Sequence, residues 1–175
     1  KALQENGLEN NTIVIFTSDH GYHLGEHDFW AKVSLLDQSS GVPLIISVPG
    51  EKPAVCDSFV ELLDLYPTTA KLCGLEVPDR LQGKDISPML KDPEYEVRDA
   101  AFSVAPMRKG FLLRDKNYSF IQYGENAENG IELFDIKSDP GQFANLAVKE
   151  EKQSLVDSYR KKMTAKLQAI RNNDL

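Results

Sequence analysis

The chain has 175 residues, of which 41% are hydrophobic and 27% are charged, and its formal net charge is −7. This apolar content suffices for the core of about one soluble domain. The acidic balance argues against a nucleic-acid partner, because phosphate binding needs a basic surface. No run of about 18 apolar residues occurs, so we predict no membrane span.

The first residues, KALQENGLENN, lack the apolar core of a signal peptide and are typical of the last turns of a helix. A chain that starts in this way is expected to be the C-terminal part of a longer protein. The alternative is a short, frayed N-terminus.

Two apolar stretches, residues 12–17 and 42–48, predict strands. Neither stretch alternates with polar residues, which is typical of strands that are buried on both faces, as in a parallel sheet. Residues 19–41 between them are rich in Gly, His, Asp and Ser, and we predict a long functional loop there.

The rest of the chain predicts a helix over residues 59–75, ended by Gly74, and a short helix around Ser87–Leu90. Short antiparallel strands are then expected at 111–114, 118–123 and 131–136, because turn-rich segments join them. An amphipathic helix is expected over residues 148–170. Its apolar stripe comprises Leu155, Tyr159, Met163, Leu167 and Ile170.

This order of elements predicts two zones. Residues 1–105 have the strand–helix order of an α/β sandwich, and residues 106–175 predict a small antiparallel sheet with a closing helix, an α+β subdomain. Because a mean sheet has about 5–6 strands, two strands make the first zone an incomplete α/β core.

All three histidines of the chain, His20, His23 and His27, lie in the predicted loop. Asp19 and His20 come where the first strand ends, and ligands of open α/β sheets bind at the carboxyl ends of strands. Their oxygen and nitrogen atoms can ligate a divalent cation. Two ligands are too few, since Ca²⁺ takes about 6–8 oxygen ligands and structural Zn²⁺ about four ligands.

Two other interpretations of this loop stay open. The spacing of the histidines would place them on one helical face as a local zinc site, but Gly21 and Gly25 disfavour a helix. The His-Glu-x-x-His order of zinc proteases is absent. The second alternative is a solvated, histidine-rich surface loop.

Four segments, taken in order, resemble the C-terminal half of the type I sulfatases of the alkaline phosphatase superfamily. They are FTSDHGYHLGEHDFWAK, VPLIISVPG, LLDLYPTTAKLCGLEVPDRLQGKDISPML and ELFDIKSDPGQFANLA. The similarity is strongest to the branch that includes iduronate-2-sulfatase and its bacterial relatives. It implies the C-terminal part of an alkaline-phosphatase-like α/β sandwich, and an enzyme that hydrolyses sulfate esters, with sulfated sugars as candidate substrates.

The resemblance also implies roles for single residues. Asp19 and His20 match the pair that completes the family's active-site cation shell, for which Ca²⁺ is expected. Lys32 matches the lysine that contacts the substrate sulfate, and we assign it a catalytic and substrate-binding role. A compact ammonium with three donors suits a tetrahedral anion.

Other positions of the motif are expected to support the site. Glu26, His27 and Trp30 match LGEHxxW and are expected to shape the loop. Tyr22 and His23 match variable positions and are expected to line the substrate pocket.

Two features lie outside this motif. Gly41 replaces the basic residue that relatives usually carry before VPL. In the C-terminal subdomain, Arg108, Tyr118 and Tyr123 are candidate walls of the substrate cleft.

The family's nucleophile is a formylglycine made from the Cys of a Cys-x-Pro-x-Arg motif, and neither Cys56 nor Cys73 lies in one. We therefore expect the formylglycine in an upstream segment, and this chain alone to be inactive. The expected partners are the N-terminal part of the enzyme and a sulfated carbohydrate or another sulfate ester. The alternatives are a phosphonate or phosphate ester hydrolase and a non-catalytic module. Relatives are exported, periplasmic or lysosomal, but the chain itself gives no location.

Overall fold

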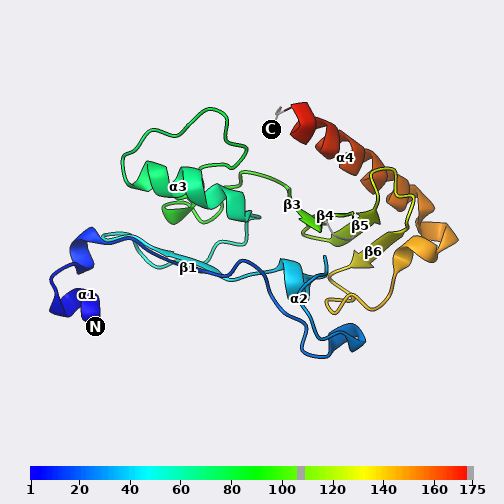
Figure 1. Ribbon diagram of the computed structural model, residues 1–175, viewed down its shortest axis with the longest axis horizontal. Helices are drawn as coiled ribbons and strands as arrows, with labels where there is room; N and C mark the ends of the chain where they lie inside the picture. Colours follow the sequence, from blue (N-terminus) through cyan, green and yellow to red (C-terminus); the bar gives the residue numbers. More distant parts are fainter. Residues whose placement is uncertain (106–108, 173–175) are drawn as a thin grey trace.

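The computed structural model describes residues 1–105 and 109–172. It contains a two-stranded and a four-stranded sheet, which lie at different places along the chain (Figure 1). Helix α1 (Ala2–Glu5) begins the chain, as its first residues predicted. The candidate wall residue Arg108 lies outside the described residues.

The two-stranded sheet consists of β1 (Val14–Thr17) and β2 (Leu44–Ser47), which pair antiparallel. The predicted parallel arrangement of these strands is therefore wrong. Thr17 lies opposite Leu44, so the segment between the strands leaves and re-enters the sheet at the same end. That segment carries only the short helices η2 (Glu26–Asp28) and α2 (Asp37–Ser40), not a crossover helix that would return the chain in parallel.

The prediction that both strands are buried on both faces is also wrong for this chain. Val14, Phe16 and Ile45 are 44%, 60% and 59% exposed. Two strands have too few neighbours in the described structure to cover both faces of their sheet. The apolar pattern identified the strands but not what lies over them.

The helix predicted over residues 59–75 is shorter in the structure. It consists of η3 (Leu62–Asp64) followed by α3 (Leu65–Leu72), and Gly74 follows with a φ of 70°. Glu61 is extended and forms a capping box with Asp64, which sets the start. The predicted short helix is confirmed as η4 (Ser87–Leu90).

The four-stranded sheet is antiparallel throughout, in the order β3-β4-β5-β6. Its strands are β3 (Ala100–Ala105), β4 (Gly110–Asp115), β5 (Tyr118–Tyr123) and β6 (Ile131–Asp135). The three predicted hairpin strands are confirmed. Strand β3 was missed, because AAFSVA is rich in small residues and carries little strand signal. The sheet therefore begins before residue 106.

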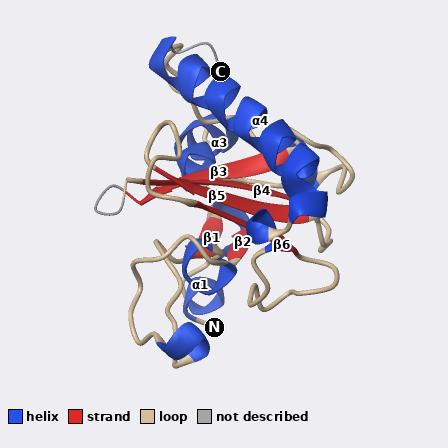
Figure 2. Ribbon diagram, turned by 90° about the vertical axis from the view of Figure 1, so that its right-hand side faces the viewer, coloured by secondary structure: helices blue, strands red, loops and turns tan. Residues whose placement is uncertain are grey.

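Helix α4 (Gln153–Asn172) lies across one face of this sheet (Figure 2). It follows the short turns η6 (Leu146–Val148) and η7 (Glu150–Lys152). Among the described residues, no helix is long and apolar enough to cross a membrane.

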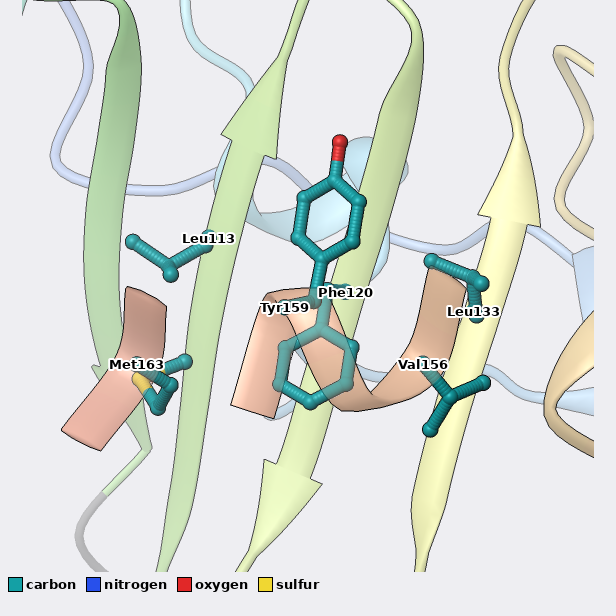
Figure 3. Packing of buried hydrophobic residues seen from close by; sticks show 6 residues of the cluster. All are labelled: Leu113, Phe120, Leu133, Val156, Tyr159 and Met163. Carbon is teal, nitrogen blue, oxygen red and sulfur yellow. The ribbon is translucent and has the colours of Figure 1, made fainter. Parts of the chain in front are cut away.

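The core between α4 and the sheet is built from both elements (Figure 3). Its buried members are Leu113, Phe120, Leu133, Val156, Tyr159 and Met163. Tyr159 donates a hydrogen bond to Asp115, and burial together with this bond raises the pKa of its hydroxyl. Each large apolar side chain that is fully buried contributes about 1.5–3 kcal/mol, so this layer holds the subdomain together.

The opposite face of the sheet contacts the loop between β1 and β2. Leu35 from that loop is 3% exposed and packs in a cluster with buried residues of the sheet. The sheet members of this cluster are Ala105, Leu112, Ile121 and Phe134. The sheet is thus a middle layer between α4 and the loop.

A buried ion pair joins the α3 region to the segment that enters β3. Asp64 has no exposed surface and accepts hydrogen bonds from both terminal nitrogens of Arg98. It also accepts from the backbone N–H groups of Glu61 (2.7 Å) and Lys84 (2.8 Å). Burial alone would lower the pKa of Arg98, but the Asp64 bond and the charges of Glu61 and Asp64 raise it.

We predict that Asp64→Ala in the full-length protein lowers the free energy of unfolding by about 3–5 kcal/mol. The change leaves the buried Arg98 without its main partner and removes the acceptor of two backbone N–H groups. Urea unfolding measures the effect. As a control, Asp157→Ala breaks an exposed pair with Arg160 and should cost less than about 1 kcal/mol. Equal effects of the two variants would contradict the prediction.

Candidate active site

The end of β1 presents a carboxylate and an imidazole side by side. The Asp19 Oδ2 and His20 Nε2 atoms are 3.6 Å apart, and the Asp19 side chain is 84% exposed. His20 Nδ1 lies 2.8 Å from the backbone oxygen of Gly21. Because a carbonyl oxygen only accepts, Nδ1 carries the proton, and the lone pair of Nε2 is free to bind a ligand.

This pair fits one divalent cation. Ligand bonds of about 2.0–2.6 Å from an oxygen and a nitrogen to one ion are compatible with donor atoms at this separation. In the part of the chain that the structure describes, no group of three or more His, Cys, Asp or Glu side chains could hold a metal ion. The pair can therefore supply part of a cation shell.

Gly21 brings the Asp19-His20 pair against α2. Its backbone N–H donates to the Ser39 oxygen at 2.8 Å. A Cβ atom at position 21 would lie 2.1 Å from the Gln38 backbone oxygen, so a side chain there would push α2 away. The close approach requires glycine at this position.

Lys32 lies in the same cleft as Asp19 and His20, which has a volume of about 810 Å³. We call it the Lys32 cleft; the end of β1, α2 and strand β3 contribute to its walls. The Lys32 side chain is exposed, and its ammonium has no ion pair or hydrogen bond with any described residue. A cation that is not neutralised by the protein can bind an anionic group.

Tyr22 and His23 do not line the Lys32 cleft. His23 has no exposed surface, and its Nε2 lies 2.7 Å from the Ser34 hydroxyl. The Tyr22 hydroxyl donates to the Trp30 backbone oxygen at 3.4 Å. These contacts place both residues as supports of the loop, and a contact of either with substrate stays a prediction.

Glu26 and Trp30 both make contacts within their own loop, as a loop-shaping role would require. Glu26 accepts a 2.6 Å hydrogen bond from the Leu24 N–H. Backbone hydrogen bonds from Glu26 itself and from Leu24 lower the pKa of this carboxyl. The Trp30 ring packs on Gly25, where a Cβ would lie 3.2 Å from the ring and φ is 121°.

His27 joins the loop to the C-terminal subdomain. Its Nε2 lies 3.0 Å from the Gly141 oxygen, and its ring stacks on Phe143 with centroids 4.5 Å apart. Next to it, the buried Gln142 side chain accepts a 2.7 Å bond from the Asp37 N–H. No sequence signal pointed to Gln142, because a single Gln outside a periodic segment carries no pattern.

An ion pair between Asp37 and Arg114 was also missed. Arg114 Nε donates to both carboxylate oxygens at 3.1 Å, and Nη2 donates to Oδ2 at 3.0 Å. The pair ties α2 to β4. No local pattern could have matched two residues so far apart in the sequence.

The candidate wall residues of the subdomain lie on different faces of the sheet. Tyr118 packs edge-on against Tyr159 under α4, so it faces away from the Lys32 cleft. Tyr123 lies with the Leu35 cluster, and its hydroxyl is 3.1 Å from Glu132 Oε2. Neither residue lines the cleft.

Gly41 and the two cysteines limit what this chain can supply. A Cβ at Gly41 would lie 2.8 Å from the Asp37 oxygen, so a basic side chain there would require the end of α2 to shift. Cys56 lines the cleft, and Cys73 is exposed. Because neither cysteine has the formylglycine motif around it, these residues do not fit the family's nucleophile.

The chain is similar to known proteins in sequence and in fold. Residues 25–172 match the family described as N-sulphoglucosamine sulphohydrolase, C-terminal. Arylsulfatase K of Xenopus laevis is 31% identical over 159 residues, covering 83% of this chain and 30% of the relative. An ulvan-active sulfatase of Formosa agariphila is 32% identical over 180 residues, covering 95% of this chain and 35% of the relative.

Solved structures share the fold. A phosphonate monoester hydrolase from Silicibacter pomeroyi has a TM-score of 0.85 at 26% identity, covering 98% of this chain and 37% of that chain. A 2-O GAG sulfatase has a TM-score of 0.77 at 28% identity, covering 99% of this chain and 39% of that chain. The chain spans about a third of the length of the curated relatives described above. The family match covers most of the chain, and it therefore belongs to the type I sulfatases of the alkaline phosphatase superfamily, as their C-terminal domain.

Proposed function

We propose that this chain forms the C-terminal part of an enzyme that hydrolyses sulfate esters. The observation that carries the proposal is the Lys32 cleft, where the Asp19-His20 pair, which we propose binds the cation, lies together with the ammonium of Lys32. The remaining N-terminal part of the enzyme is the proposed partner. It would supply the other cation ligands and the formylglycine.

Each of these residues has a distinct task in the proposed reaction. Hydrolysis breaks the bond between sulfur and the ester oxygen, and negative charge grows on the oxygens around the sulfur. Lys32 binds and neutralises one of the sulfate oxygens. A divalent cation held by Asp19 and His20, with Ca²⁺ the best candidate, would supply Lewis-acid stabilisation of the same charge.

Asp19 and His20 would hold that cation through Oδ and Nε2. In the neutral ring, the Gly21 carbonyl accepts from Nδ1–H and so favours the tautomer whose Nε2 lone pair can bind the cation. Without a nucleophile among its motifs, the chain by itself is proposed to be inactive.

Sulfated carbohydrate is the proposed substrate class. Its support comes from relatives, since one is named an ulvan-active sulfatase and another a 2-O GAG sulfatase. A closer relation to iduronate-2-sulfatase is part of this proposal and rests on the motif series alone.

A second candidate function is hydrolysis of phosphonate esters. The structural similarity to the phosphonate monoester hydrolase, with a TM-score of 0.85, favours it. A divalent cation held by Asp19 and His20, together with the Lys32 ammonium, would suit a phosphonate as well as a sulfate, because both groups are tetrahedral anions.

We predict that Lys32→Ala in the full-length enzyme lowers kcat/KM for an aryl sulfate by about 10²–10³-fold, since it removes a donor aimed at developing charge. Initial rates of sulfate release measure the effect. Lys149→Ala, an exposed lysine outside the cleft, is the matched control and should leave the rate unchanged. Normal turnover by Lys32→Ala would refute its assigned role.

We predict that His20→Ala in the full-length enzyme weakens Ca²⁺ binding by at least about tenfold, because it removes a ligand. Isothermal titration of the metal-free enzyme measures the affinity. Asp157→Ala, which removes an exposed carboxylate outside the Lys32 cleft, is the control. Equal Ca²⁺ affinities of the wild-type and His20→Ala enzymes would exclude His20 as a ligand.

The two candidate functions predict different rate ratios. A sulfatase should show a higher kcat/KM for 4-nitrophenyl sulfate than for a 4-nitrophenyl phosphonate ester, and a phosphonate hydrolase the reverse. Side-by-side assays of one full-length preparation decide between them. Loss of both activities in Lys32→Ala would show that a single site is responsible.

A further inference from the structure

Ser39 contacts both halves of the proposed site. It is the third residue of α2 and is 3% exposed. Its backbone oxygen accepts the Gly21 N–H at 2.8 Å, next to the Asp19-His20 pair. Its hydroxyl donates to the backbone oxygen of Lys32.

The neighbouring Ser40 shows what a serine in this helix ordinarily does. Its hydroxyl donates at 3.0 Å to the oxygen of Leu36, four residues earlier in the chain. This is the common local bond of serine in helices. The Ser39 hydroxyl bonds instead across the loop to Lys32, so it links segments that are not neighbours in the chain.

We propose that Ser39 is a positioning residue that sets the place of Lys32 relative to the Asp19-His20 pair, a role that rests on the proposed sulfate contact of Lys32. The two links of Ser39 differ in kind. The bond to Gly21 uses the backbone and is available to any residue at position 39. The bond to Lys32 uses the hydroxyl and is lost when that group is removed.

Burial makes the hydroxyl bond effective. Water does not compete for a bond at a side chain that is only 3% exposed. Without the hydroxyl, the Lys32 oxygen keeps the Ser34 N–H at 3.1 Å, which is a contact within its own turn. No bond within that turn fixes the position of Lys32 relative to the Asp19-His20 pair. Small displacements of a binding group are costly to catalysis.

The test compares Ser39→Ala with Ser40→Ala in the full-length enzyme. Each variant removes one hydroxyl from the same short helix, but only the first removes a bond to Lys32. We expect Ser39→Ala to raise KM for a sulfate ester about three- to tenfold, the effect of one hydrogen bond, with a smaller change in kcat. Ser40→Ala, which removes a local bond at the start of the helix, should raise KM less than Ser39→Ala does.

Ca²⁺ affinity, measured by isothermal titration, separates positioning of Lys32 from general loosening. It should stay at the wild-type value in Ser39→Ala, because the bond from Gly21 to the Ser39 backbone remains. In a Lys32→Ala background, Ser39→Ala should have no further effect on KM. Equal KM values for the Ser39 and Ser40 variants would overturn the proposal, as would a fall in Ca²⁺ affinity parallel to the rise in KM.

Hydrogen exchange gives a readout that does not depend on activity. Ser39→Ala should speed amide exchange in residues 31–34 and leave residues 19–21 as protected as in Ser40→Ala. If Ser39→Ala folds poorly, Ser39→Cys, a near-isosteric but weak donor, takes its place.

These readouts distinguish the two proposals. Absence of sulfate ester hydrolysis by the full-length protein, or normal turnover by Lys32→Ala, overturns the proposed function. The exchange data then still decide whether Ser39 positions the Lys32 segment, and unchanged exchange in residues 31–34 refutes it.

Discussion

The docking of Leu35 against the four-stranded sheet is the constraint on which the candidate site depends. Leu35 is buried among Leu112, Ile121 and Phe134, and the nearby ion pair of Asp37 with Arg114 fixes the start of α2 on the same sheet. Helix α2 in turn holds residues 19–21, because its Ser39 oxygen accepts the hydrogen bond of the Gly21 N–H. A short helix with no buried stripe of its own is stable here because the sheet provides its partners.

The C-terminal subdomain is therefore part of the site's framework. The bonds from His27 to Gly141 and from Asp37 to Gln142 join residues 114 and 105 positions apart in the chain. On its other face the sheet packs on α4, whose core fixes the strands that α2 contacts. Asp64 and Arg98 anchor the α3 region in a similar way, because an ion pair whose side chains are 0% and 11% exposed is held in one geometry by its hydrogen bonds.

Local sequence patterns predicted the helices and strands whose formation depends on interactions between residues close in the chain. The stripe of Tyr159 and Met163 marked α4, and the hairpin turns marked β4 to β6. The resemblance selected Asp19, His20 and Lys32, and the structure brings these three into one cleft. Strand β3 was not predicted, because its small residues have weak strand propensity and its place at the edge of the sheet depends on pairing with β4.

By itself, the sequence determined the family, most elements and the residue types of the candidate site, because periodicity, turn residues and motifs can be recognised in the sequence without the fold. Only the tertiary structure decided the antiparallel pairing of β1 with β2, the burial of His23, and the contacts of Gln142, Arg114 and Ser39. These depend on which distant segments meet, and hydrogen bonds between single polar residues leave no repeating pattern along the chain.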